Sequence, residues 1–381
     1  MTEFTWIETQ SDFEDLVTHV CEQSAYALDT EFHRERTYLP VLALIQVATR
    51  ERIALVDPLA VDVRPFRQAL EGNGVCVMHA ASQDLEILEL ACGVPPKYLF
   101  DTQIAALFCG YRTSSLAKLV EGFLDLRLDK SAQLSDWTRR PLPRRDLEYA
   151  VSDVAHLLPL RDSLIDTLDA RGRLDWAEEE IERLRAKDRS EADPQTLWWK
   201  LRGKAKLGGK ARGVAQELAA WRHEEARRRD RPVRLVLSDM ALLSIAQRPP
   251  RDVRDLRGIR GFDAQRFKQT DELLAAVERG RELSPSELRL PPRKPTDLPN
   301  VEGAITLCLA WLAQRASAED LDMTVLGTRE DVTSFVLGKP SRLGTGWREE
   351  LVGRELRSIV DGSAAVRVNG DQLELLRRTQ T

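Results

Sequence analysis

Acidic side chains interrupt apolar or helical patterns at three places in the chain. Asp29 and Glu31 lie inside YALDTEF, Asp84 follows the apolar run GVCVMHA, and Tyr149 and Asp153 lie in EYAVSDVAHLL. Residues i and i+2 of a strand point to one face, so Asp29 and Glu31 are expected side by side. Tyr149 and Asp153 are i and i+4 of a helix and share a face. Like charges this close are unfavourable unless a cation neutralises them.

Four carboxylates from a strand, a helix start and a late helix suit one chemistry. Two divalent cations about 3.5–4 Å apart can stabilise both the attacking and the leaving oxygen of a phosphodiester. Mg²⁺ binds to a few carboxylates together with water and substrate oxygens. Taken singly, each acid has a plainer explanation: a solvated strand end, a first-turn helix acid, or a surface Tyr–Asp pair. Their order along the chain favours the metal site, with the tyrosine hydroxyl orienting the attacking water.

The elements around these acids predict an α/β domain with a mixed sheet. Apolar runs indicate strands, and 3.6-residue spacing indicates helices. The expected strands are 24–32, 41–49, 52–58 and 74–80, with a hairpin near 49–51 and a short fifth run that starts at 98. The expected helices are 84–93, one beginning near 116, and 144–172, a long helix or pair of helices with a kink at Pro159.

Composition excludes several classes of protein. The chain has 381 residues with 43% hydrophobic and 31% charged residues, which is enough apolar material for folded cores. No run approaches the roughly 18 apolar residues of a membrane helix, and the acidic start shows no secretory signal. The five scattered cysteines lack the clustering of zinc or disulfide frameworks. We therefore expect a cytoplasmic protein with reduced thiols and no membrane partner.

The net charge of −5 conceals a basic middle segment. Residues 1–200 carry 23 Lys/Arg against 35 Asp/Glu, residues 201–290 carry 21 against 13, and residues 291–381 carry 12 against 13. The middle net charge of +8 (21 minus 13) suggests a polyanion partner, although a solvated surface also explains it. Its cations include Lys204, Lys206, Lys210, Arg212 and the run Arg227–Arg229.

Pattern changes along the chain predict the domain organisation. Residues 205–288 and 301–381 are helical in pattern, and five prolines in 283–300 indicate a linker. The expected domains are 1–200, 205–288 and 301–381, with the linker over 289–300.

At this point the sequence resembles a known family. DTEF (29–32), HAASQDL (79–85) and YAVSD (149–153) match the three exonuclease motifs of the DEDD superfamily in its tyrosine-bearing subclass. The stretch 129–154 resembles the region before the third motif in bacterial ribonuclease D. Residues 205–285 resemble the helicase and ribonuclease D C-terminal (HRDC) domain, and the last part fits a diverged second copy.

The resemblance implies an RNase H-like α/β exonuclease domain followed by two small all-α HRDC-type domains. It implies 3′→5′ hydrolysis of RNA to nucleoside 5′-monophosphates, usually in tRNA 3′-end maturation, with two divalent metal ions, Mg²⁺ or Mn²⁺. Asp29 would bridge both metals, and Glu31 and Asp153 would complete the site that activates water. Asp84 would hold the other metal, and Tyr149 would position the nucleophilic water.

Two other functions stay open from the sequence. A DNA 3′→5′ exonuclease of the proofreading type would use the same motifs, because the metals contact phosphate whereas the 2′-hydroxyl distinguishes RNA. A non-catalytic RNA-binding adaptor would keep the fold and lose a metal carboxylate, but all four are present.

A few further residues are weaker candidates. His79 is expected to be structural, and Gln46 to face the substrate. His33, Arg34 and Arg36 follow the first motif and are candidates for phosphate contacts. Three tryptophans in the helical region are expected to pack rather than stack on bases: Trp198, Trp199 and Trp221.

Overall fold

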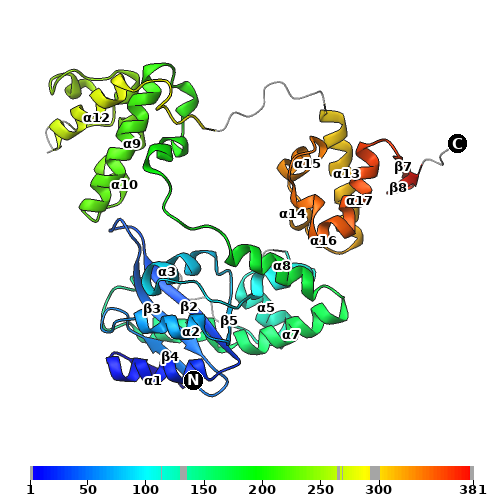
Figure 1. The fold of residues 1–381 in the computed structure, drawn as a ribbon. Coiled ribbons are helices and arrows are strands. Elements are labelled where there is room, and N and C mark those ends of the chain that lie inside the picture. Colours follow the sequence, from blue (N-terminus) through cyan, green and yellow to red (C-terminus); the bar gives the residue numbers. More distant parts are fainter. Residues whose placement is uncertain are drawn as a thin grey trace. The chain divides into compact units, whose positions relative to one another are not determined.

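The computed structural model describes residues 3–112, 114–128, 135–263, 267, 269–291 and 301–377 (Figure 1). Contacts divide the chain into two compact units. Unit 1 comprises 1–31, 42–187 and 297–381, and unit 2 comprises 32–41 and 188–296. The first residues of the 129–154 motif (129–134) and most of the expected linker (292–300) lie outside the described residues.

Unit 1 contains a six-stranded mixed sheet in the order β1-β4-β3-β2-β5-β6. The strands are β1 (Thr5–Ile7), β2 (Ala25–His33), β3 (Val41–Ala48), β4 (Ile53–Val56), β5 (Val75–Met78) and β6 (Leu99–Asp101). β3 and β4 are antiparallel and form the expected hairpin, whereas β1–β4, β2–β5 and β5–β6 are parallel. β2, the strand that carries two of the candidate acids, therefore lies inside the sheet.

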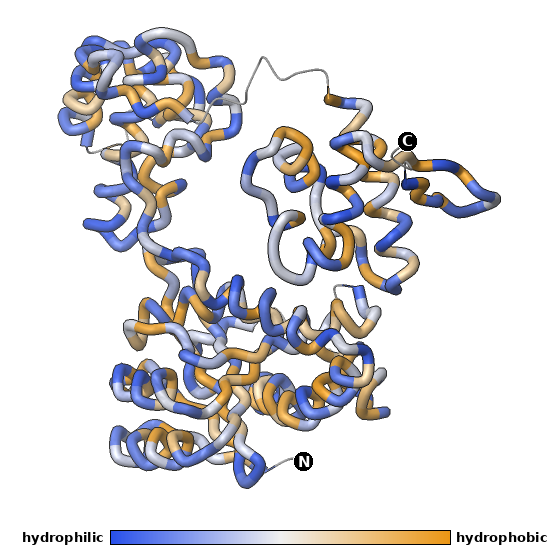
Figure 2. The backbone as a smooth tube through the Cα atoms, turned by 45° about the vertical axis from the view of Figure 1, so that its right-hand side comes forward, coloured by the Kyte–Doolittle hydropathy of each residue, from blue (hydrophilic) through white to orange (hydrophobic). Residues whose placement is uncertain are grey.

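Helices cover both faces of this sheet because its strands are apolar on both sides. One face packs on α1–α3 through residues such as Phe13, Leu70 and Leu85, and the other packs on α4–α8 through residues such as Leu119 and Leu164. The apolar strands lie between these helical layers (Figure 2). The helices are α1 (Gln10–Cys21), α2 (Arg67–Glu71), α3 (Ser82–Cys92), α4 (Thr102–Phe108), α5 (Leu116–Leu124), α6 (Arg144–Ala155), α7 (Leu157–Ala170) and α8 (Leu174–Arg185).

The prediction of a kink at Pro159 gives the wrong position for the break between the two helices. The helix pair breaks at His156, and Pro159 is the third residue of α7. A proline is tolerated in the first turn, where the backbone N–H has no partner within the helix. Proline here marks the start of a second helix rather than a bend in one.

Unit 2 is helical around the long helix α9 (Lys210–Arg228). Its core contains Trp198, Leu218, Leu242 and Val277 among other residues. The other elements are η2 (Pro194–Lys200), η3 (Lys204–Lys206), α10 (Val233–Val236), α11 (Asp239–Gln247), η4 (Asp255–Gly258) and α12 (Thr270–Glu282). Residues 32–41, which join β2 to β3, are also part of this unit.

The last part of the chain is helical over 302–360, as expected, but it is not all-α. Its helices are α13 (Glu302–Ala318), α14 (Met323–Leu326), α15 (Arg329–Val336), α16 (Gly346–Arg348) and α17 (Arg354–Val360), with short helices η5 (Arg342–Gly344) and η6 (Glu349–Gly353). An antiparallel hairpin, β7 (Ala364–Asn369) and β8 (Gln372–Arg377), follows them. Alternating apolar and polar residues flank the step Asn369–Gly370 in this hairpin, and Gly370 has a φ of +64°. Such a step is a strong hairpin signal.

The last helices pack against the exonuclease part within unit 1. The Trp347 ring stacks on Trp176 with centroids 5.0 Å apart and meets Phe108 edge-on. The buried Arg348 pairs with Glu180. This part therefore supports the helical face of the sheet. Within the described residues, no helix combines the length and apolar character needed to cross a membrane.

Candidate active site

Strand β2 and helix α6 bring three of the predicted acids together. Asp29 and Glu31 alternate with the buried Thr30 on β2, and Asp153 comes from α6. One carboxylate oxygen from each of the three lies within 4.8 Å of the other two. Ala27, on the same face of β2, belongs to the core that α6 also enters. The two-residue period of the strand thus turns both acids toward the helix.

Asp84 lies beside this group but outside its 4.8 Å limit. It occupies the first turn of α3, is 8% exposed, and accepts a 2.5 Å hydrogen bond from the Thr30 hydroxyl. Its negative charge acts on both Asp29 and Glu31. Thr30, between the two strand acids, therefore fixes the fourth carboxylate through its own side chain.

Burial and mutual repulsion raise the pKa values of these acids. Burial, then the charges of Asp84, Asp153 and Glu31, raise the pKa of Asp29 well above its usual value. Burial and the neighbouring negative charges raise the pKa of Glu31 to about 8. Burial raises the pKa of Asp153 to about 7, although its hydrogen bond with Tyr149 opposes the rise. When these acids ionise, no side chain of the described residues neutralises them through an ion pair, so the folded chain retains protons on them instead.

Tyr149 joins the cluster as the helix spacing predicts. It lies one turn before Asp153 on α6, and the two side chains share a hydrogen bond. Burial and the neighbouring carboxylates raise the pKa of Tyr149, so its hydroxyl stays protonated at neutral pH. The Trp137 ring lies 6.2 Å from the tyrosine ring and limits its movement.

A buried ion pair anchors the segment before α6. Arg140 donates two hydrogen bonds of 2.6 Å to Asp57, which is 5% exposed. Arg140 also donates to the carbonyl oxygens of Trp137 and Ala43, at 2.8 and 2.7 Å. A bidentate arginine–carboxylate pair fixes orientation as well as distance. It ties the approach to α6, and hence Tyr149, to the sheet.

Asp101 is a positioning residue that the sequence analysis missed. This carboxylate is 1% exposed and accepts backbone N–H groups from Ala80 and Ala81 in the turn before α3. It also caps α4 through the N–H groups of Gln103 and Ile104. The turn that presents Asp84 therefore depends on it. An aspartate between an apolar run and a helix is an N-cap signal that was available in the sequence.

Two weaker predictions have different outcomes. His79 is structural, because its Nδ1 lies 3.0 Å from the Thr102 hydroxyl and burial lowers its pKa. Gln46 does not face the substrate, because it is 0% exposed within β3. The prediction placed it on a solvent-facing side, whereas helices cover both faces of the sheet.

The aromatic and basic candidates of unit 2 are partly engaged within that unit. Trp198 and Trp199 both donate to the Arg289 carbonyl oxygen, and Trp221 is 8% exposed next to Phe267. These contacts fit the packing interpretation.

The arginine run of α9 forms ion pairs with neighbouring acids. Arg227 pairs with Glu191, and Arg228 and Arg229 pair with Glu225. Lys206 and Lys210 are exposed. The lysines are therefore better placed than the arginine run to meet a polyanion.

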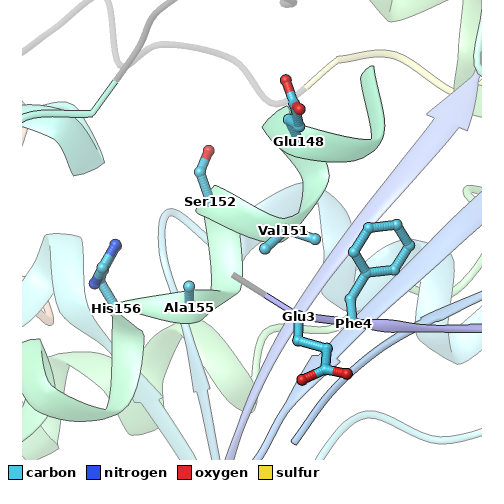
Figure 3. Close-up of a pocket in the computed structure, with 7 residues that line it drawn as sticks. All are labelled: Glu3, Phe4, Glu148, Val151, Ser152, Ala155 and His156. Atoms are coloured by element: carbon cyan, nitrogen blue, oxygen red, sulfur yellow. The ribbon is translucent and has the colours of Figure 1, made fainter. Parts of the chain in front are cut away.

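A cavity of ≈ 590 Å³ lies along a face of α6 other than the one that carries Tyr149 and Asp153 (Figure 3). Side chains from the start of the chain and from the end of α6 line it: Glu3, Phe4, Glu148, Val151, Ser152, Ala155 and His156. None of the clustered acids lines this cavity, so it is separate from the candidate active site.

The donor set fits hard divalent cations. Mg²⁺ and Mn²⁺ prefer carboxylate and water oxygens. Three carboxylates whose oxygens converge, and whose pKa values rise through burial and mutual repulsion, lack a counter-charge that such cations would supply. The residues present therefore fit a divalent metal site.

Comparisons with known proteins agree with the fold. The profile of a 3′–5′ exonuclease family matches residues 4–169, and that of the HRDC domain matches residues 211–277. Ribonuclease D of Zymomonas mobilis is 35% identical over 92% of this chain and 92% of its own. Ribonuclease D of Granulibacter bethesdensis is 33% identical over 98% of this chain and 96% of its own.

Solved structures give the same result. Escherichia coli RNase D, described as an exoribonuclease involved in structured RNA processing, has a TM-score of 0.84 at 31% identity. The match covers 95% of this chain and 99% of that one. The catalytic core of RRP6 from Trypanosoma brucei has a TM-score of 0.61 at 28% identity and covers 74% of this chain and 80% of that one.

Fold and site define a 3′–5′ exonuclease domain joined to an HRDC domain. More narrowly, the chain belongs to the ribonuclease D family of 3′–5′ exoribonucleases.

Proposed function

We propose that Asp29, Glu31, Asp84 and Asp153 together hold two divalent cations, Mg²⁺ or Mn²⁺, and that the chain uses them to hydrolyse RNA from its 3′ end. The observation that carries this proposal is that three carboxylates lie with one oxygen each within 4.8 Å of the other two and form no ion pair within the described residues. Asp29 has the position for the shared ligand, because the charges of the other three carboxylates all act on it. Glu31 and Asp153 would hold the cation that activates the attacking water, and Asp84 would hold the cation that stabilises the leaving oxygen.

The bound cations would supply Lewis-acid stabilisation of the attacking and leaving oxygens. The chain's own residues orient the reacting groups. Tyr149 keeps its proton at neutral pH, so it can hold a water molecule by hydrogen bonding but cannot deprotonate it. Its hydrogen bond with Asp153 would keep that water beside the acid cluster. The Thr30 hydroxyl keeps Asp84 in position by hydrogen bonding. The products of the proposed reaction are nucleoside 5′-monophosphates.

We infer that the substrate is a structured RNA with a free 3′ end, and a tRNA precursor in particular. The E. coli relative is described as acting in structured RNA processing, and tRNA maturation is the usual task in the family. The cytoplasm is the expected compartment. All five cysteines are free, as is common where thiols stay reduced.

Product analysis tests this function. A tRNA precursor with a defined 3′ end is incubated with the full chain, with Mg²⁺ or with a chelator. The expected result is stepwise 3′ shortening and release of 5′-monophosphates with Mg²⁺ only. Binding without mononucleotide release would instead favour the adaptor. Matched RNA and DNA oligonucleotides decide between the ribonuclease and the proofreading-type activity, and faster digestion of DNA would overturn the RNA assignment.

A further inference from the structure

The boundary between the two units falls inside the strand that carries the metal-site acids. Glu31 is the last residue of this stretch in unit 1, and Phe32 is the first in unit 2. Strand β2 nevertheless continues to His33. The segment 32–41, which joins β2 to the neighbouring strand β3, therefore belongs by its contacts to the helical unit.

Tyr38 fastens this segment to the helical unit. Its hydroxyl donates a 2.9 Å hydrogen bond to Glu191 Oε1 and lies 2.9 Å from His223 Nε2. His223 Nε2 in turn lies 2.8 Å from the same Glu191 oxygen. The tyrosine and histidine rings meet edge-on with centroids 5.3 Å apart. The Tyr38 backbone N–H donates to Asp230 Oδ1 at 3.0 Å.

The residues that contact segment 32–41 come from α9, from the residue stretch after α9, and from the stretch before η2. His223 lies within α9, Asp230 follows its C-terminal end, and Glu191 lies ahead of η2. The His223 side chain is 12% exposed, so most of its contacts are with protein atoms and few are with solvent. Arg227 of α9 also pairs with Glu191 at 3.4 Å. The network is therefore a built contact rather than a single surface hydrogen bond.

Segment 32–41 also carries two arginines that are close in sequence to the acids of β2. Arg34 and Arg36 follow Glu31 by three and five residues. Three residues span at most about 10 Å of extended chain. Arg34 lies over the Phe32 ring at 5.0 Å. An RNA strand whose 3′ end reaches Glu31 would therefore have its phosphates near these arginines.

We propose that Tyr38, together with His223 and Glu191, is a positioning residue that holds segment 32–41 for RNA that extends beyond the reacting nucleotides. Through this contact the HRDC-bearing unit fixes the loop that leaves the metal strand. Tyr38 does not take part in the chemical step. This inference rests on the proposed function, because it assigns the loop a place along the RNA that enters the acid cluster.

The test compares Tyr38→Phe with the full wild-type chain on two substrates. A long single-stranded RNA has phosphates beyond the one at the acid cluster, whereas a dinucleotide has none. Loss of the hydroxyl should raise KM for the long RNA by roughly five- to tenfold, the effect of losing one ordinary hydrogen bond. We expect kcat on the long RNA, and both constants on the dinucleotide, to stay within about twofold.

Two further variants make the result specific. Tyr98→Phe is the matched control, because Tyr98 is 45% exposed on unit 1 and its ring lies under Lys97; it should change neither constant. Glu191→Gln, at an exposed carboxylate, should reproduce the KM increase of Tyr38→Phe. The double variant should show no larger increase than either single variant, because both break the same contact.

Three results would overturn the proposal: an unchanged KM for the long RNA in Tyr38→Phe, an equal change on the dinucleotide, or additive effects in the double variant. Failure of the proposed function is a separate result, because the wild-type chain would then release no mononucleotide from either substrate.

Discussion

Acids that are buried or half-buried have opposite surroundings in the two units of the molecule. In unit 1, Asp29, Glu31 and Asp153 converge with one another and form no ion pair in the described part of the chain. In unit 2, the Glu225 side chain is 2% exposed and accepts two hydrogen bonds from Arg228, at 2.9 and 2.6 Å. A buried acid neutralised by its own chain stabilises a fold. A group of half-buried acids without such a partner retains protons or binds a cation from outside.

The pKa directions give the same contrast. Burial and neighbouring carboxylates raise the pKa of Glu31 to about 8. For Asp331 in the last part of the chain, burial also acts upward, but hydrogen bonds from Arg342 and Thr328 lower its pKa below its usual value. The difference between the two sites is the presence of a positive partner. It separates a candidate metal site from a structural ion pair without any reference to the sequence motifs.

The largest effect is expected from Asp29→Asn. The change is nearly isosteric and removes the charge that both cations would share, so hydrolysis should fall by more than about a hundredfold, beyond the loss from a residue that only supports a metal ligand. RNA affinity without hydrolysis should change little. Mononucleotide release and a filter-binding assay check the two halves. Activity within tenfold of wild type would reject the shared-ligand role.

The next largest effect is expected from Asp101→Ala. Four backbone N–H groups lose their acceptor, and two of them hold the turn before Asp84. We expect kcat/KM to fall about ten- to hundredfold and the free energy of unfolding to fall by about 2–3 kcal/mol. Steady-state kinetics and urea unfolding measure these changes.

Asp322→Ala is the matched control for Asp101→Ala. Asp322 also caps a helix, by accepting the Thr324 N–H at 2.8 Å, but it lies in the last part of the chain. It should cost about 1 kcal/mol of stability and leave kcat/KM unchanged. Equal catalytic losses in the two variants would contradict a positioning role for Asp101.

The sequence predicted which of the acids lie close together, because this part of their geometry is local. A strand places residues i and i+2 on one face, and a helix places i and i+4 together, so Asp29 with Glu31 and Tyr149 with Asp153 follow from spacing alone. The structure brings these four side chains into the same region. The exact place of Asp84, outside the tight group, does not follow from spacing.

Contacts between distant segments escaped prediction. Arg140 and Asp57 are 83 residues apart, and no local rule pairs them. The first strand, Thr5–Ile7, has three residues, which is too short for a periodic signal. The hairpin at 364–377 and the cap at Asp101 do have local signals in the sequence, an Asn-Gly step and an aspartate directly before a helix. Gln46 was misplaced because burial on both faces of a strand depends on helices elsewhere in the chain.

The raised pKa values predict a pH dependence of folding stability. Burial raises the pKa of Asp153 from 3.8 to about 7 and the pKa of Glu31 from 4.5 to about 8 in the folded chain. Between these limits the folded chain binds more protons than the unfolded chain, so stability falls as pH rises. The thermal midpoint of the metal-free chain should therefore decrease between about pH 5 and pH 8.

The variant Glu31→Gln makes this pH prediction specific. It removes one titrating group and should flatten the slope of stability against pH. Thermal scans in the presence of a chelator measure both chains. The same slope in wild type and variant would show that the acid cluster is not the source of the pH dependence.

The smallest effect is expected from Glu225→Gln in unit 2. The variant weakens charge-assisted hydrogen bonds to Arg228, whose side chain is 62% exposed and can turn to solvent. We expect a loss of about 1–2 kcal/mol in the free energy of unfolding and unchanged hydrolysis of a trinucleotide. A catalytic loss in the folded variant would remove the contrast between the two groups of buried acids.

Calorimetric titration of Mn²⁺ into the metal-free chain at neutral pH tests the central claim most directly. Binding to a cluster with raised pKa values should release protons, seen as a heat that depends on the ionisation enthalpy of the buffer. The account predicts proton-releasing Mn²⁺ binding in wild type and its loss in Asp29→Asn. Undiminished binding in Asp29→Asn, or binding without proton release, would contradict it.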